Sequence, residues 1–111
     1  MYRSTPIEPG SFDVTLERIG QLRLAPTTDA EASPDEASVV VRTSREAVIY
    51  RTADLVRGGA VPYGLRIAIE GLKEWQGEGV ALGTHGALFL ASEGWRLSPA
   101  GTFLSLRCKL P

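Results

Sequence analysis

The carboxy-terminal end of the chain alternates apolar and polar residues with a period of two. The apolar positions are Leu104, Leu106, Cys108 and Leu110. The polar positions between them are Ser105, Arg107 and Lys109. This period is the geometry of a β-strand with one buried face and one face in water. The pattern predicts a strand over residues 102–110. It also predicts a fold in which other strands pair with this strand and a second layer packs on its apolar face.

Shorter runs before this strand predict its neighbours. Residues 80–82 and 95–98 have the composition of half-buried strands, while residues 87–91 are apolar on both faces, which is typical of an interior strand covered above and below. Glycine-containing turns separate these runs, at Glu93-Gly94, at Ala100-Gly101 and at residues 83–86. We expect residues 80–110 to form an antiparallel meander of three or four strands.

Two further hairpins are predicted upstream. Residues 12–24 alternate about a turn at residues 19–21. Residues 39–42 are rich in β-branched side chains, and residues 47–52 would pair back onto them. A helix from Ser44 to Arg57 is the alternative for this second region; the β-branched and aromatic run favours the hairpin, followed by a helical turn at residues 53–57.

The segment 62–76 permits two interpretations. Leu65, Ala68, Ile69, Leu72 and Trp75 follow helical spacing, with charged residues opposite them. Alternation of Leu65, Ile67 and Ile69 favours a strand instead, and a glycine in a helix interior costs about 1 kcal/mol relative to alanine. Because only the helix accounts for Leu72 and Trp75, a helix over residues 62–76 is preferred.

The chain of 111 residues is long enough for one domain with its own core. We expect residues 1–11, with two prolines and no apolar period, to form an amino-terminal arm, and residues 12–111 to form a single domain. Residues 27–38 carry four acids and no base, which predicts an exposed acidic loop. The predicted fold class is α+β: a mostly antiparallel sheet, arranged as a sandwich or a partial barrel, with one main helix at 62–76.

The sequence offers few residues for chemistry. His85 is the only histidine, so a metal site built from several histidines is ruled out. Cys108 is the only cysteine and lies on the apolar side of its strand, as a small core residue would. Phosphate-binding loops, dinucleotide fingerprints and nucleophile elbows are missing from the sequence. We therefore expect no catalytic residue, no cofactor and no metal, and no small-molecule substrate can be identified.

The best candidate for an interaction surface is a segment rich in arginine, flanked by tyrosines. Its residues are Arg42, Arg45, Arg51, Arg57, Arg66, Tyr50 and Tyr63. Such a surface could hold phosphate or an acidic protein. An ordinary charged face, balanced by Glu46 and Asp54, is the simpler interpretation.

Residues 94–101, Gly-Trp-Arg-Leu-Ser-Pro-Ala-Gly, resemble the second wing strand of winged-helix regulators. The resemblance covers these eight residues alone, and it implies a small nucleic-acid-binding regulator. In that family a helix usually follows the wing, whereas residues 102–110 alternate as a strand, and the three expected helices ahead of the wing cannot be found. Nucleic-acid binding is therefore the alternative function.

The preferred function is a non-catalytic structural or accessory subunit that binds a protein partner or itself. A secretion machine or a virus particle is an example of such an assembly. The arm, the acidic segment and open sheet edges favour this hypothesis, because small β proteins add onto neighbours through such features. No apolar run long enough to cross a membrane and no signal-peptide pattern occur in the sequence, so we expect a cytoplasmic protein, or one within a virion.

Overall fold

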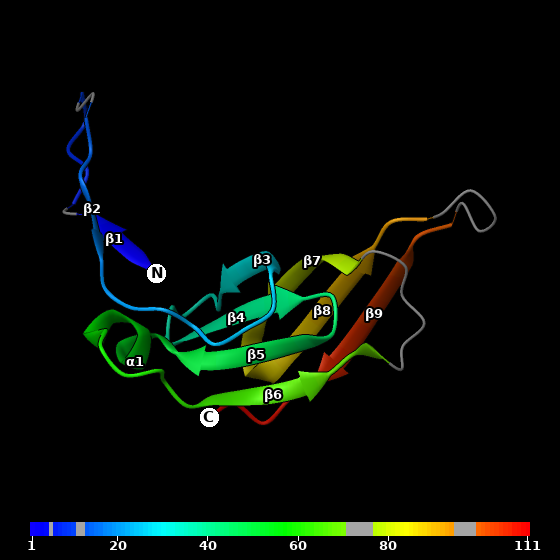
Figure 1. Ribbon diagram of the computed structural model, residues 1–111. Helices are drawn as coiled ribbons and strands as arrows, with labels where there is room; N and C mark the ends of the chain where they lie inside the picture. The colour runs from blue at the N-terminus through cyan, green and yellow to red at the C-terminus, as the bar shows by residue number, and fades with distance from the viewer. Residues whose placement is uncertain (5, 11–12, 71–76, 95–99) are drawn as a thin grey trace.

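The structure is a computed structural model that describes residues 1–4, 6–10, 13–70, 77–94 and 100–111. Its strands form three antiparallel sheets (Figure 1). The two-stranded sheet pairs β1 (Tyr2–Ser4) with β2 (Leu16–Arg18). The four-stranded sheet has the order β3 (Thr27–Ala32), β4 (Ser38–Thr43), β5 (Glu46–Arg51) and β6 (Gly64–Ala68). The three-stranded sheet has the order β7 (Gly77–Leu82), β8 (Ala87–Ser92) and β9 (Thr102–Arg107). The predicted β-rich α+β class is confirmed.

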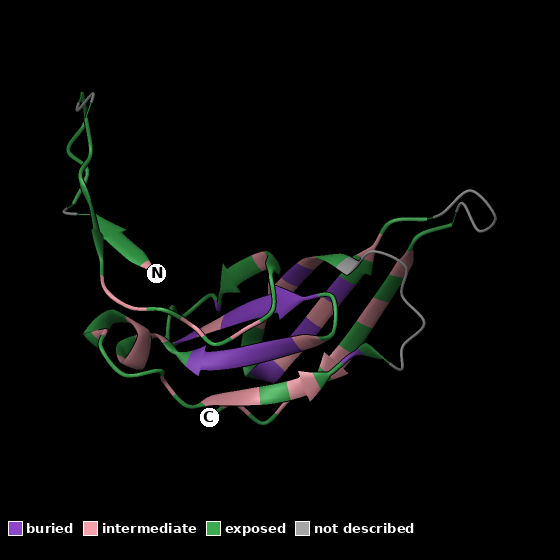
Figure 2. Cartoon of the chain, in the orientation of Figure 1, coloured by how far each residue is buried: buried purple, intermediate pink, exposed green. Residues whose placement is uncertain are grey.

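The four-stranded and three-stranded sheets pack face to face and bury the main core between them (Figure 2). Its buried members are Val40, Ala47, Ile49, Ile69, Val80, Leu82, Leu88 and Leu90. Leu104, Leu106, Cys108 and Leu110 are half-buried against this cluster. Complete burial of one such aliphatic side chain contributes about 1.5–3 kcal/mol, so this interface holds the fold together.

A second, smaller cluster covers the outer face of the four-stranded sheet. Val41, Val48 and Tyr50 are buried there, beneath Leu22, Leu24, Val39 and Leu55. Leu55 comes from α1 (Thr52–Arg57), the six-residue helix that follows β5. The central strands β4 and β5 are therefore covered on both faces, which explains why they carry consecutive apolar residues rather than a strict alternation.

The carboxy-terminal meander is confirmed as three strands joined antiparallel, with the 3₁₀ turn Thr84–Gly86 between β7 and β8. The expectation that residues 87–91 are covered on both faces is wrong. Leu88 and Leu90 are fully buried, whereas Phe89 is half-buried and Ala91 is exposed. On the outer face, among the described residues, Phe89 stacks with Phe103 at a centroid distance of 6.0 Å. The strand expected at 95–98 lies outside the described residues.

The predicted hairpin of residues 39–52 is confirmed as β4 and β5, which pair Val40 with Ile49 and Val41 with Val48. The helical turn that follows it is confirmed as α1. Its carboxyl end is Gly58, at φ 69°. A Cβ at Gly58 would lie 2.5 Å from the carbonyl oxygen of Ile19, so a glycine is needed both for the backbone conformation and for this close approach.

The helix predicted at 62–76 is wrong where the structure describes the segment. Residues 64–68 form the strand β6, which pairs with β5, and residues 71–76 lie outside the described residues. The strand predicted by the alternation of Leu65 and Ile67 forms in place of the helix, because both side chains pack on the main core from one face of the strand. A Cβ at Gly64 would lie 2.5 Å from Val48 Cγ1 and 2.7 Å from Tyr50 Cε1, so glycine here leaves room for the side chains of Val48 and Tyr50 on the neighbouring strand.

The acidic loop predicted at 27–38 is also wrong in its first half. Residues 27–32 form the edge strand β3, which pairs with β4. The amino-acid composition did not indicate this strand, because only Asp29 in it is half-buried and the other residues are exposed. Asp29 accepts a hydrogen bond from the backbone N–H of Val80 on β7 (2.8 Å), so an acidic side chain joins the two sheets.

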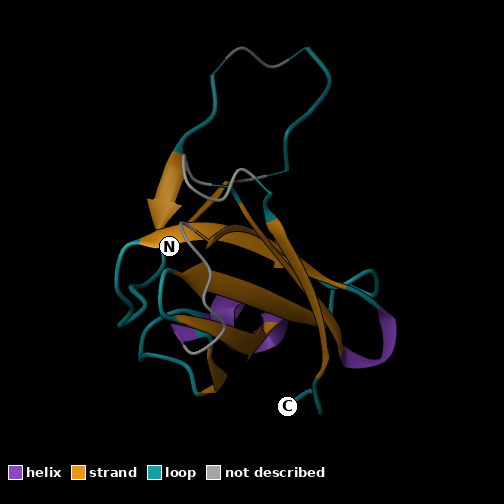
Figure 3. Ribbon diagram, turned by 90° about the vertical axis from the view of Figure 1, so that its right-hand side faces the viewer, coloured by secondary structure: helices purple, strands orange, loops and turns teal. Residues whose placement is uncertain are grey.

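The hairpin predicted within residues 12–24 does not form among the described residues. β2 pairs instead with β1, near the start of the chain, in the register Tyr2–Arg18 to Ser4–Leu16. The resulting two-stranded ribbon, with the described residues between its strands, is called the arm below. The arm stands off from the sandwich in both views (Figure 1 and Figure 3).

In the part of the chain that the structure describes, no helix has both the length and the apolar character needed to span a membrane.

Candidate functional site

The arm is fixed to the sandwich at its base. The amino group of Met1 donates a hydrogen bond to the carbonyl of Gly20 (2.7 Å), and the N–H of Ile19 donates to the carbonyl of Met1 (3.0 Å). The N–H of Gly59 donates to the carbonyl of Ile19 (2.9 Å), which ties the arm to the loop after α1. These bonds set the direction in which the arm leaves the body.

The rest of the arm packs against little. Four of its apolar side chains are exposed: Tyr2 at 64%, Ile7 at 67%, Val14 at 41% and Leu16 at 59%. Its only described ion pair is also exposed, between Arg3 and Glu17 at 2.9 Å. An isolated two-stranded hairpin is at best marginally stable in water. The arm is therefore a candidate site for contact with another molecule.

A second group of exposed apolar side chains lies in and just after α1. Its members are Val56 at 54%, Val61 at 42% and Tyr63 at 85%. Two depressions share the lining residues Val61, Pro62 and Tyr63. The larger, of about 570 Å³, is completed by Tyr50, Gly64, Leu65 and Arg66. The smaller, of about 260 Å³, is completed by Asp54, Arg57, Gly58 and Ala60. We call these two adjoining depressions the Tyr63 hollow. It begins beside Gly58 and Gly59, where the arm is attached.

The structure divides the predicted arginine-rich surface. Arg42 and Tyr50 are 0% and 1% exposed, so neither presents an exposed side chain, although Tyr50 forms part of the wall of the Tyr63 hollow. Arg42 faces into the sandwich, where its guanidinium donates to the carbonyls of Gly79 (2.6 Å) and Ala91 (3.0 Å). These carbonyls lie at an irregularity in the pairing of β7 with β8. Arg42 therefore joins the two sheets and stabilises the fold.

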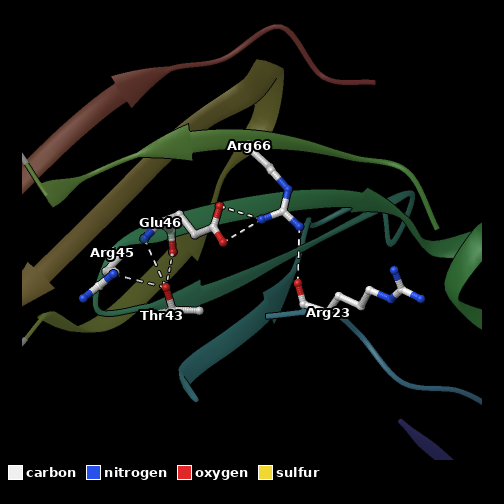
Figure 4. A network of polar contacts seen from close by, with 5 residues as sticks. All are labelled: Arg23, Thr43, Arg45, Glu46 and Arg66. Carbon is white, nitrogen blue, oxygen red and sulfur yellow. Dashed lines mark hydrogen bonds and ion pairs between the residues drawn. The ribbon is translucent and has the colours of Figure 1, made fainter. Parts of the chain in front are cut away.

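The remaining four arginines are exposed, and each is paired with a carboxylate. Arg66 forms two hydrogen bonds with Glu46 (2.6 and 2.8 Å) and one with the carbonyl of Arg23 (3.3 Å) (Figure 4). Glu46 raises the pKa of Arg66 further by accepting these bonds. Arg45, in the β4–β5 turn that Thr43 stabilises, pairs with Glu70 at 3.3 Å. These pairs resemble the ordinary charged face that the sequence also allowed.

At the other end of β5, Arg51 and Arg57 share one carboxylate. Their distances to Asp54 are 3.1 and 3.5 Å, and both guanidinium-bearing side chains are largely exposed. Two positive charges against one negative charge leave a local surplus of one. Tyr63 lies next to this cluster across the Tyr63 hollow, which Arg57 and Asp54 also line. Of the seven predicted residues, Arg57, Arg66 and Tyr63 are the ones that border the hollow as exposed side chains.

His85 lines a separate pocket of about 340 Å³, together with Asp35 and Ser33. Ser33 donates a hydrogen bond to Asp35 (2.5 Å) and the N–H of Ala37 donates another (3.1 Å); these bonds hold the pKa of Asp35 below its usual value. The Ser33 hydroxyl is therefore directed to a carboxylate, not to the imidazole. This arrangement does not make serine a nucleophile, because the activating base would have to be His85.

Cys108 is half-buried, and burial raises the pKa of its thiol. A raised thiol pKa opposes nucleophilic chemistry, which depends on the thiolate. Among the described residues, no group of three or more His, Cys, Asp and Glu side chains is arranged to hold a metal ion.

The sequence predicted an arm over residues 1–11 only, and neither the inclusion of β2 in the arm nor the exposed apolar side chains were foreseen. Tyr2 and Ile7 share no period with their neighbours, and Val14 and Leu16 were assigned to the hairpin predicted at residues 12–24. Sequence reasoning also missed the Tyr63 hollow, because a helix predicted over residues 62–76 would have placed Tyr63 in its first turn.

Comparison with known proteins found no family model, curated protein or solved structure that matches the chain.

Proposed function

We propose that this protein is a non-catalytic assembly subunit that binds other protein chains through its arm. The observation that carries the proposal is the set of exposed apolar side chains on the arm, Tyr2, Ile7, Val14 and Leu16. Contact with a partner would remove these side chains from water. This burial contributes about 25 cal/mol of favourable free energy for each Å² of apolar surface. Such an arm suits a subunit of a larger structure, of the kind found in virus particles and secretion machines.

The anchored base of the arm supports the same function. Because three hydrogen bonds to backbone carbonyls join residues 1, 19, 20 and 59, the ribbon leaves the body in a defined direction. A preorganised element loses less conformational freedom on binding than a flexible tail does. Both edges of the ribbon also present backbone groups that can pair with a strand of a partner.

The proposed absence of catalysis rests on where the reactive groups lie. The Ser33 hydroxyl donates to Asp35, and the thiol of Cys108 has a raised pKa. His85 is exposed and has no described hydrogen bond that would orient its ring for proton transfer. A general base is usually held by a partner group in this way.

Nucleic-acid binding is the second candidate function, and the surplus positive charge of Arg51 and Arg57 over Asp54 favours it. Phosphate groups would compete with Asp54 for these two guanidinium groups. Binding of this kind weakens steeply with added salt. Retention on heparin resin at low salt, lost in an Arg51→Gln/Arg57→Gln variant, is the expected result; no retention at low salt removes this candidate.

The main proposal is tested by comparing the wild-type chain with an Ile7→Asp/Val14→Asp variant. Both side chains are exposed, so the variant should fold with an unchanged circular dichroism spectrum. Light scattering and a pull-down from the source cells are expected to show the wild type in a species larger than the monomer, alone or with a captured protein, and the variant as a monomer. A strictly monomeric wild type that captures nothing, or capture unaffected by the two substitutions, contradicts the proposal.

A further inference from the structure

We infer that the partner of the arm is a second copy of this chain, and that the arm of each copy occupies the Tyr63 hollow of the other. This inference rests on the proposed function and adds the identity of the partner. It starts from the distribution of exposed apolar side chains. Eight large apolar residues are exposed in the described chain; four lie on the arm, Val61 and Tyr63 line the hollow, and the other two are Val56 on α1 and Phe103 on β9.

The two surfaces have complementary shapes. The arm is a ribbon that projects away from the sandwich (Figure 1). The hollow is a depression in the body, lined by Val61, Pro62 and Tyr63, with volumes of about 570 and 260 Å³ in its two parts. The side chains exposed near the far end of the arm, Ile7 and Val14, are of a size that such a depression can hold.

The charges of the two surfaces are also complementary. Residues 6–14 of the arm contain Glu8 and Asp13 and no basic residue, giving a formal charge of −2. The hollow is bordered by Arg57, whose cluster with Arg51 and Asp54 carries a surplus of one positive charge. Opposite charges at the rim of an interface accelerate association and fix its register. The acidic segment 6–14 of the arm, with its apolar side chains, therefore fits a basic, apolar hollow on the same kind of chain.

The positions of the two surfaces favour a reciprocal exchange. Gly59 is hydrogen-bonded to Ile19 at the base of the arm, and its chain neighbours Gly58 and Ala60 line the hollow, so both surfaces lie at the same end of the molecule. A two-fold axis near that end can bring each arm to the hollow of the other copy, which closes the assembly as a dimer. In a reciprocal exchange of arms each arm–hollow contact occurs twice. The total buried area is therefore closer to the roughly 1,200–2,000 Å² buried in stable interfaces.

The test uses two variants of the full chain that impair the two surfaces separately. The arm variant is Ile7→Asp/Val14→Asp, and the hollow variant is Val61→Asp/Tyr63→Asp. Sedimentation velocity of the wild type is expected to show a dimer that weakens with added salt, whereas each variant alone is expected to be a monomer. An equimolar mixture of the two variants is expected to regain dimers, because one intact arm then meets one intact hollow.

The matched control is Phe103→Ser, which removes an exposed aromatic ring from β9 and should leave the dimer unchanged. Circular dichroism of all variants identifies any that fail to fold; for such a variant, Tyr63→Ser or Ile7→Ser is the milder replacement. A monomeric wild type at every concentration overturns the inference, and so does a mixture that stays monomeric while the wild type dimerises. If the wild type is monomeric yet captures a different protein through Ile7 and Val14, the inference fails while the proposed function stands.

Discussion

The arm and the sandwich are both built from antiparallel strand pairs, but the sandwich buries apolar side chains of its strands and the arm leaves them exposed. In β9 the alternating residues Leu104 and Leu106 pack on the main core, whereas in β2 the exposed Leu16 meets no buried cluster. Both strands are paired antiparallel, so backbone geometry does not explain the difference. The sandwich has a second sheet to cover its apolar face, and the arm has none. Antiparallel pairing can therefore form extended structure whose apolar side chains the rest of the described chain leaves exposed.

The largest expected difference between the two regions is in the cost of removing a leucine. Leu90→Ala in β8 should lower the free energy of unfolding by about 2–5 kcal/mol, because a fully buried side chain leaves a cavity. Leu16→Ala on the arm is the matched control and should change it by less than about 0.5 kcal/mol at concentrations where the chain is monomeric. Urea denaturation followed by tryptophan fluorescence measures both. Similar losses for the two variants would mean that the arm belongs to the cooperative core.

A smaller effect is expected for the arginine that joins the sheets. Arg42→Met keeps the length of the side chain but removes the hydrogen bonds to the carbonyls of Gly79 and Ala91, which should destabilise the fold by about 1–3 kcal/mol. Arg45→Met is the control, because the exposed pair with Glu70 should contribute less than about 1 kcal/mol. Thermal unfolding separates the two outcomes. Equal melting temperatures for the two variants would contradict a structural role for Arg42.

The smallest expected effect concerns acid stability and lies in the turn between β3 and β4. Because the pKa of Asp35 is lowered in the folded chain, its ionised form stabilises the fold above the ordinary value of 3.8, and this contribution is lost as the pH falls through the lower folded value. Asp35→Asn should therefore flatten the decline in stability over that acidic range. Denaturant unfolding at several acidic pH values measures the slope.

The arm supplies the control for this acid effect. Arg3 and Glu17 form an exposed pair, so Glu17→Gln should leave the same slope nearly unchanged. Parallel pH profiles for the wild type and Asp35→Asn would show that the turn is not the acid-sensitive element.

How much could be predicted depended on how local the governing interactions were. The hairpin of β4 and β5 was predicted because its β-branched residues and its turn are adjacent in sequence. The segment at 64–68 fitted both a helical and a strand period. It forms a strand because it pairs with β5, against which Leu65 and Gly64 pack. Residues 27–32 gave no apolar signal at all, since an edge strand with exposed side chains is held by backbone pairing with β4.

The candidate site was less predictable than the fold. Arg42 and Arg45 look alike in sequence, yet one lies inside the sandwich and the other lies in water. The arm was expected as an irregular segment, and the pairing of Tyr2–Ser4 with residues that follow a dozen positions later escaped notice. Both errors concern contacts between residues distant in sequence, which no window of the chain can reveal.

By itself the sequence determined the β-rich class, the carboxy-terminal meander and the central hairpin, because side-chain alternation and turn residues act between near neighbours. Only the tertiary structure decided that Arg42 and Tyr50 are covered and that the apolar side chains of the arm are not. Burial is a property of two surfaces that meet, and the chain reaches its own second surface in the sandwich but not at the arm.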